Sequence, residues 1–115
     1  MKKAVICASI ALCTQVSGQT TTSFGGVDCG KWTAATGPTK VAYETWLAGY
    51  MSGLNAALTV FTKVDVLKQV DSSEQISQWV SNYCRNNPLE RVPSAAQELF
   101  AELQRKLNAA GQKKN

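Results

Sequence analysis

Apolar residues recur every three or four positions over most of this chain, and this pattern predicts helices. The longest run covers residues 39–62. Its larger apolar side chains would share one helix face: Tyr43, Leu47, Met51, Leu54, Leu58 and Phe61. A second face carries small side chains, among them Gly49 and Gly53. Each glycine inside a helix costs about 1 kcal/mol relative to alanine, so we expect a second backbone to approach this face and the helix to be central.

A short turn and another amphipathic segment follow. Asp65 can cap a turn over 66–70, and overlapping capping boxes at 71–75 predict a helix start. The apolar residues of this helix keep the spacing i, i+3, i+4, i+7 and i+8: Ile76, Trp79, Val80, Tyr83 and Cys84. The Asn86-Asn87-Pro88 sequence ends the helix, because the residue before a proline disfavours the helical conformation. Cys84 is therefore expected on the buried face.

The last helix is predicted between Pro93 and Gly111. It begins with the capping box Ser94-Ala95-Ala96-Gln97. Its apolar stripe comprises Leu99, Phe100, Leu103 and Leu107. No stretch alternates with period two for long enough to compete as a strand. The sequence thus predicts an all-α fold, a small bundle of four to five helices.

The N-terminus has the pattern of a cleaved signal peptide over residues 1–18. Lys2 and Lys3 precede an apolar run over 4–13, and Val16-Ser17-Gly18 offers small residues at a cleavage site. The run is too short to span a bilayer as a permanent helix. We therefore expect a periplasmic or secreted protein without stable membrane insertion.

The remaining residues divide into three parts. Residues 19–28 are polar and contain two glycines, which is typical of a flexible N-terminal arm. Residues 29–110 form the expected helical domain, and residues 111–115 form a short basic tail.

Removing the signal peptide leaves two cysteines, Cys29 and Cys84. Two cysteines in a small exported chain predict one disulfide that staples the bundle. Such a bridge closes a loop of about 56 residues, and its loop-closure entropy is worth roughly 4 kcal/mol.

Charge and composition exclude several classes of function. Without Lys2 and Lys3, ten basic residues face eight acidic ones, and a net charge of +2 does not indicate binding to nucleic acid. The chain has no histidine, and no serine lies in an SxxK box or a nucleophile elbow. We therefore expect no catalytic residues, no metal site and no cofactor, which means a protein that is not an enzyme.

Three residues of the long predicted helix are candidates for binding another protein: Trp46, Tyr50 and Asn55. Tryptophan and tyrosine commonly anchor protein interfaces. Asn55 stands among apolar residues, where the alternative is a buried amide bonded to the backbone of a neighbouring helix.

Three segments carry a resemblance to known exported proteins. They are Cys29-Gly30-Lys31-Trp32, the glycine-paired Trp46-Leu47-Ala48-Gly49-Tyr50-Met51-Ser52-Gly53-Leu54-Asn55, and Gln78-Trp79-Val80-Ser81-Asn82-Tyr83-Cys84-Arg85-Asn86-Asn87-Pro88. Together with the amphipathic last helix, they resemble the HdeA-type group of exported helical proteins. They are also similar to the Rap/Tai group of type VI amidase-immunity proteins. The resemblance covers residues 29 to about 108.

The resemblance implies a periplasmic fold of four or five helices with Cys29 and Cys84 as its bridge, often as a homodimer. Its implied function is non-enzymatic binding of another protein. In the HdeA-like form the protein is an acid-stress chaperone and the partner is an unfolded client. In the alternative Rap/Tai-like form the protein inhibits a periplasmic amidase effector.

Overall fold

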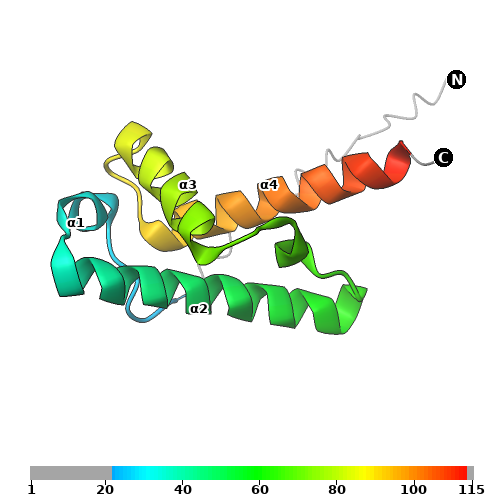
Figure 1. The fold of residues 1–115 in the computed structure, drawn as a ribbon, viewed down its shortest axis with the longest axis horizontal. Coiled ribbons are helices and arrows are strands. Elements are labelled where there is room, and N and C mark those ends of the chain that lie inside the picture. Colours follow the sequence, from blue (N-terminus) through cyan, green and yellow to red (C-terminus); the bar gives the residue numbers. More distant parts are fainter. Residues whose placement is uncertain (1–21, 114–115) are drawn as a thin grey trace, which may run out of the picture.

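The computed structural model describes residues 22–113, and most of these residues are helical (Figure 1). The elements are α1 (Cys29–Ala34), α2 (Gly37–Thr62), the 3₁₀ turn η1 (Val66–Gln69), α3 (Ser73–Asn86) and α4 (Val92–Gln112). Within this part of the chain the only β-type pairing is an isolated antiparallel bridge between Asp28 and Arg91. The predicted all-α bundle is confirmed, with four α-helices. The predicted signal peptide, residues 1–18, lies outside the described residues.

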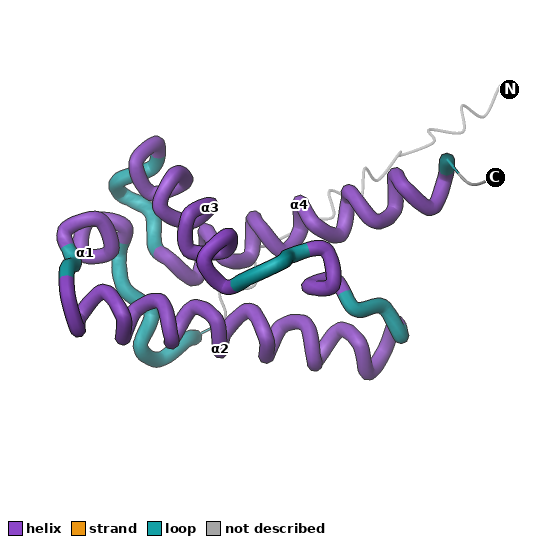
Figure 2. The backbone as a smooth tube through the Cα atoms, viewed as in Figure 1, coloured by secondary structure: helices purple, strands orange, loops and turns teal. Residues whose placement is uncertain are grey.

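The longest helix, α2, forms one side of the molecule. The tube in Figure 2 shows α1, α3, η1 and α4 all on the same side of α2. A Cβ added at Gly49 or Gly53 would meet nothing within 4 Å. The prediction that a second backbone covers this face and makes α2 central is therefore wrong for the single chain. The reason is physical: only the larger residues of α2 bury much apolar area, and Leu47 and Met51 alone are fully buried.

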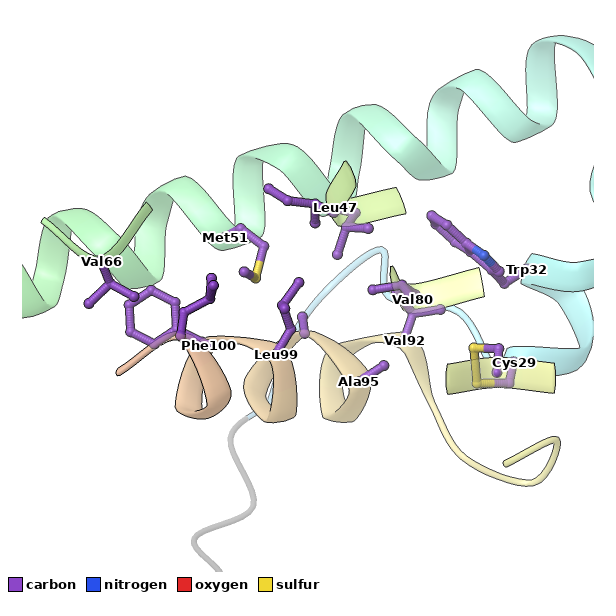
Figure 3. Close-up of a cluster of buried hydrophobic side chains, with 14 residues drawn as sticks. Cys29, Trp32, Leu47, Met51, Val66, Val80, Val92, Ala95, Leu99 and Phe100 are labelled. Carbon is purple, nitrogen blue, oxygen red and sulfur yellow. A yellow bond between two sulfur atoms is a disulfide. The ribbon is translucent and has the colours of Figure 1, made fainter. Parts of the chain in front are cut away.

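The helix at the centre of the bundle is α4. It supplies six of the fourteen apolar residues in the buried cluster: Val92, Ala95, Ala96, Leu99, Phe100 and Leu103. Figure 3 shows Leu99 and Phe100 of α4 on the side that faces Leu47 and Met51 of α2, with Val66 at one end. Phe61, which the apolar spacing placed on the core face of α2, is 86% exposed because the helix extends beyond the core at this end.

The predicted disulfide is present. Cys29, in the first turn of α1, is bonded to Cys84, in the last turn of α3, with an S–S distance of 2.08 Å. Both cysteines are buried, and so is Trp32, one turn after Cys29. The Trp32 indole N–H donates to Ser81 Oγ at 2.9 Å. The bridge and this hydrogen bond together fix α1 against the end of α3.

The arm predicted as flexible over residues 19–28 is held in place from Phe24 onward. The Trp46 indole N–H donates to the Phe24 carbonyl at 2.7 Å, and the Val92 N–H donates to the Val27 carbonyl at 2.9 Å. Gly26 lies so close to α4 that a Cβ there would be 2.5 Å from Pro93 Cγ. These contacts depend on backbone groups and on the lack of a side chain, which side-chain periodicity does not reveal.

The ends of α4 also differ from the prediction. The helix begins at Val92, two residues before the capping box, and Pro93 lies in its first turn, where the missing N–H needs no helical partner. The Val92 N–H instead finds its acceptor in the arm, at Val27. At the other end the helix continues to Gln112, so Gly111 does not end it and is not part of a free tail.

The two outward-facing glycines give the first testable prediction. Gly49→Ala and Gly53→Ala are each expected to increase the free energy of unfolding by about 1 kcal/mol, because alanine favours the helix and meets no neighbour. Gly26→Ala is the contrasting control and is expected to destabilise the protein by about 1–3 kcal/mol through the clash with Pro93. Urea denaturation followed by circular dichroism measures all three. Destabilisation by the first two substitutions would contradict the open position of this face.

Candidate functional site

A groove of about 570 Å³ lies between the first half of α2 and the outer side of α3. From α2 it is lined by Val41, Glu44, Thr45 and Ala48, and from α3 by Ser73, Glu74, Ser77, Gln78, Ser81, Asn82 and Arg85. Most of the lining side chains are polar, and several are exposed to solvent. This groove is larger than three other hollows over the described residues, and we take it as the candidate site.

The groove is hollow because small side chains line both helices where they face each other. Ser73, Ser77 and Ser81 recur every four residues and so form one row along α3. Ala48 faces them from α2. At one end the row meets the buried Trp32, which is hydrogen-bonded to Ser81. The groove is therefore part of the fixed architecture and needs no rearrangement to open.

The two walls of the groove run in opposite directions. The disulfide and the Trp32–Ser81 hydrogen bond place the end of α3 next to α1. Lys40, in the first turn of α2, lies with its Nζ 3.7 Å from the centre of the Trp32 ring. The start of α2 and the end of α3 thus meet at α1. Arg85 consequently lies at this end of the groove, and Glu74, in the first turn of α3, lies toward the other.

Hydrogen bonds at the start of α3 lower the pKa of Glu74. The main cause is its own backbone N–H, and the hydroxyls of Ser72 and Ser73 add to the effect. Glu74 therefore stays ionised below the usual range of a glutamate. Its carboxylate is an exposed negative charge among the residues that line the groove.

The cations near the groove already have partners within the chain. Burial lowers the pKa of Lys40, which Glu44 partly offsets, and its ammonium group sits over Trp32 and bonds the Trp32 carbonyl. The Arg85 guanidinium donates to the Asn82 carboxamide. Over residues 22–113 the ion pairs are Asp28–Lys31 and Glu102–Lys106, so Glu44 and Glu74 belong to neither.

Two of the three predicted partner-binding residues lie on a different side of α2. Trp46 and Tyr50 stack on each other with ring centroids 4.9 Å apart. The Trp46 N–H bonds to Phe24 of the arm, and the Tyr50 hydroxyl accepts a hydrogen bond from Gln97 of α4 at 2.9 Å. Both side chains are half-buried by these contacts and do not line the groove. Their role in binding a partner stays a prediction.

Asn55, the third predicted residue, is used within the fold. Its Oδ1 accepts hydrogen bonds from the backbone N–H groups of Val66 at 2.8 Å and Leu67 at 3.2 Å, and its Nδ2 donates to Asp65 Oδ1 at 2.8 Å. Asn55 therefore holds the first turn of η1 against α2. This arrangement agrees in part with the alternative stated for it, a buried amide bonded to a neighbouring helix: the amide bonds the backbone of η1, but the side chain is half-buried.

Sequence reasoning did not identify the groove residues as a site. The serine row lies at helical spacing on the polar face of α3, and such a face is usually a solvated surface. The signal that distinguishes it is the small size of every fourth residue on a helix otherwise rich in long polar side chains. That signal becomes specific only once α2 is known to lie opposite.

Residues 22–113 contain no group of three or more His, Cys, Asp or Glu residues arranged to hold a metal ion. Among the same residues, no helix combines the length and apolar character needed to cross a membrane. Comparison of the chain with family models, curated proteins and solved structures gave no match.

The hydrogen bonds of Asn55 lead to a second prediction. Asn55→Ala is expected to lower the free energy of unfolding by about 1–2 kcal/mol, because two backbone N–H groups of η1 lose their acceptor. Asn55→Asp keeps the acceptor but sets a carboxylate against Asp65. Combining it with Asp65→Asn restores a donor and an acceptor and should recover most of the loss. Urea denaturation measures these variants, and equal stability of all of them would contradict the capping role.

Proposed function

We propose that this chain is an exported protein without catalytic activity that binds another protein through the groove between α2 and α3. The observation that carries the proposal is the groove itself, a preformed recess between two helices. The disulfide and the shared core hold these helices in place. A recess that is already ordered loses little conformational entropy when a partner binds, which favours specific recognition.

The chemistry of the lining suits a protein surface better than a small apolar ligand. Pockets for small molecules are mostly apolar, whereas this groove presents hydroxyl, carboxamide and carboxylate groups along two helices. Such groups match the exposed backbone and polar side chains of a partner. Polar groups of this kind are typical of the rim of non-obligate protein interfaces.

The serines of the groove are better placed for binding than for catalysis. A nucleophilic serine needs a neighbouring base that accepts its proton. Ser81 Oγ instead accepts a hydrogen bond from the indole N–H of Trp32, which is not a base. The lack of histidine in the whole sequence supports the same conclusion.

The third prediction locates the partner by crosslinking in the exporting cell. A photoreactive residue at Gln78, inside the groove, is expected to give one discrete adduct with another protein. The same residue at Gln112, which is exposed near the end of α4, serves as the matched control and should not give this adduct. Adducts of equal yield from both positions, or none from Gln78, would contradict the proposal.

Two alanines on α2 extend the same experiment. One is substituted to fill the groove, and the other is its matched control. Ala48→Trp fills the groove and is expected to abolish the adduct at Gln78. Ala56→Trp places the same bulk on an exposed position two turns further along α2 and should leave the adduct unchanged. Circular dichroism of both variants checks that they remain folded.

A second candidate function is an acid-activated chaperone, as the HdeA-like resemblance suggests, and three carboxylates favour it. The main cause that lowers the pKa of Asp28 is a hydrogen bond from the Lys31 backbone N–H, at the cap of α1. Hydrogen bonds at the start of α3 lower the pKa of Glu74, and a hydrogen bond from Lys106 lowers that of Glu102. Each carboxylate stabilises the fold in its ionised form.

The direction of the pH effect follows from these pKa values. Because the pKa is lower in the folded protein, the stabilisation is complete above the ordinary values of 3.8 for aspartate and 4.5 for glutamate. It is lost as the pH falls through the still lower values of the folded state. Protonation also leaves the protein with a large positive charge, and self-repulsion then loosens the bundle.

The fourth prediction concerns this acid window. The free energy of unfolding should decrease steadily below about pH 4.5, and the triple variant Asp28→Asn, Glu74→Gln, Glu102→Gln should show a smaller decrease. At about pH 2 the chaperone function requires binding of an apolar dye and suppression of client aggregation. If neither occurs at that pH, the chaperone function is wrong, whereas the groove proposal is not affected.

A further inference from the structure

We infer that the outer face of α2 pairs with the same face of a second copy of this chain, with the two helices antiparallel. The outer face consists of exposed residues at helical spacing along α2: Ala42, Thr45, Gly49, Ser52, Gly53, Ala56 and Val60. Of these residues, Thr45 alone also lines the groove. The inference therefore does not rest on the proposed function.

The single chain leaves the outer face of α2 uncovered. Figure 1 shows α3 and α4 on one side of α2. A Cβ added at Gly49 or Gly53 would meet nothing within 4 Å. Each glycine costs the helix about 1 kcal/mol relative to alanine, and no close neighbour among residues 22–113 offsets this cost. A second helix does offset it, because small side chains allow two helix backbones to approach closely.

The outer face is prepared for removal from water. Residues 45–62 contain no Asp, Glu, Lys or Arg, although the exposed side of a surface helix normally carries charged residues. The Thr45 hydroxyl donates to the Val41 carbonyl at 2.8 Å, and the Ser52 hydroxyl donates to the Ala48 carbonyl at 2.7 Å. Both hydroxyl donors therefore keep their partners when the face is buried, and no charge has to be desolvated.

The order of the residues along α2 makes the outer face complementary to itself. Gly49 and Gly53 lie at equal distances from position 51, close to the middle of α2. Ala42 and Val60 are also equally distant from position 51. A two-fold axis at this point sets Gly49 of one copy opposite Gly53 of the other, and at the ends it sets a small alanine opposite a larger valine.

This match favours a second copy over an unrelated protein. A different partner needs a surface shaped to the outer face, whereas the face already supplies that surface when it is turned by two-fold symmetry. The absence of charge over residues 45–62 has the same consequence. Like charges across a symmetric interface repel each other, and here no like charges meet.

The size of the outer face sets the strength of the pairing. Between Ala42 and Val60 the face is about 27 Å long, at a rise of about 1.5 Å per residue. One pair of helices of this length buries less than the roughly 1,200 Å² of a stable complex. We therefore expect a weak dimer that forms as the protein concentration rises.

The experiment follows the mass of the folded protein by sedimentation equilibrium from about 10 μM to about 1 mM, a range suited to weak association. The dimer fraction is expected to rise across this range. Gly49→Gln with Gly53→Gln should weaken dimerisation at least tenfold, because two long side chains hold the helices apart. Glutamine favours a helix, and each new side chain enters open space, so circular dichroism should show an intact fold.

A control pair and a crosslinking experiment test the surface and its direction. Ala109→Gln with Ala110→Gln, at exposed positions of α4, should leave dimerisation unchanged. Ala42→Cys and Val60→Cys are made separately and treated with a short bismaleimide. A mixture of the two variants should give a crosslinked dimer, and each variant alone should give little, because the antiparallel register sets position 42 against position 60. The native cysteines are bonded and buried, so they do not react.

Three results would overturn the inference: a monomer over the whole concentration range, unchanged dimerisation of the Gly49→Gln, Gly53→Gln protein, or equal crosslinking by each cysteine variant alone. A monomer whose adduct at Gln78 disappears in the Gly49→Gln, Gly53→Gln protein would assign the outer face to the protein partner and not to a second copy. Failure of the proposed function is distinguishable, because sedimentation of the purified chain needs no partner.

Discussion

The covalent contact between the first turn of α1 and the last turn of α3 determines most of the arrangement of this protein. The Cys29–Cys84 bridge fixes a helix of six residues that would be too short to persist alone. It thereby holds Trp32 beneath the end of the groove, where the indole contacts Ser81 of α3 and Lys40 of α2. One bond thus sets the relative position of three helices.

The sequence allowed prediction of the features that depend on periodicity and on the compartment. The helices α2, α3 and α4 and the turn at 66–69 follow from apolar spacing, and the bridge follows from the two cysteines that remain after the expected signal peptide; the short helix α1 was not predicted. Features that depend on the close approach of two backbone segments could not be predicted from the sequence. The fit of Gly26 on Pro93 is one case, and the solvent-facing position of Gly49 is the opposite case, although both are glycines in the sequence.

The candidate site shows the same division between local and tertiary information. Asn55 stood out in the sequence because it is polar among apolar neighbours, and the structure gives it a structural task at η1. Glu44 and Ser77 did not stand out, because each alone is an ordinary residue of a solvated helix. They line the same groove only because α2 packs beside α3, and this packing is visible only in the tertiary structure.

The position of α4 in the chain has a consequence for the order of folding. The residues enclosed by the bridge, 30–83, include α2, η1 and most of α3, whereas α4 lies outside this loop and supplies the largest part of the core. If the chain is exported as proposed and emerges from its N-terminus, both cysteines reach the oxidising side before residues 92–112 do. The bridge is then able to close around an incomplete core, and arrival of α4 becomes the step that buries the apolar faces of the other helices.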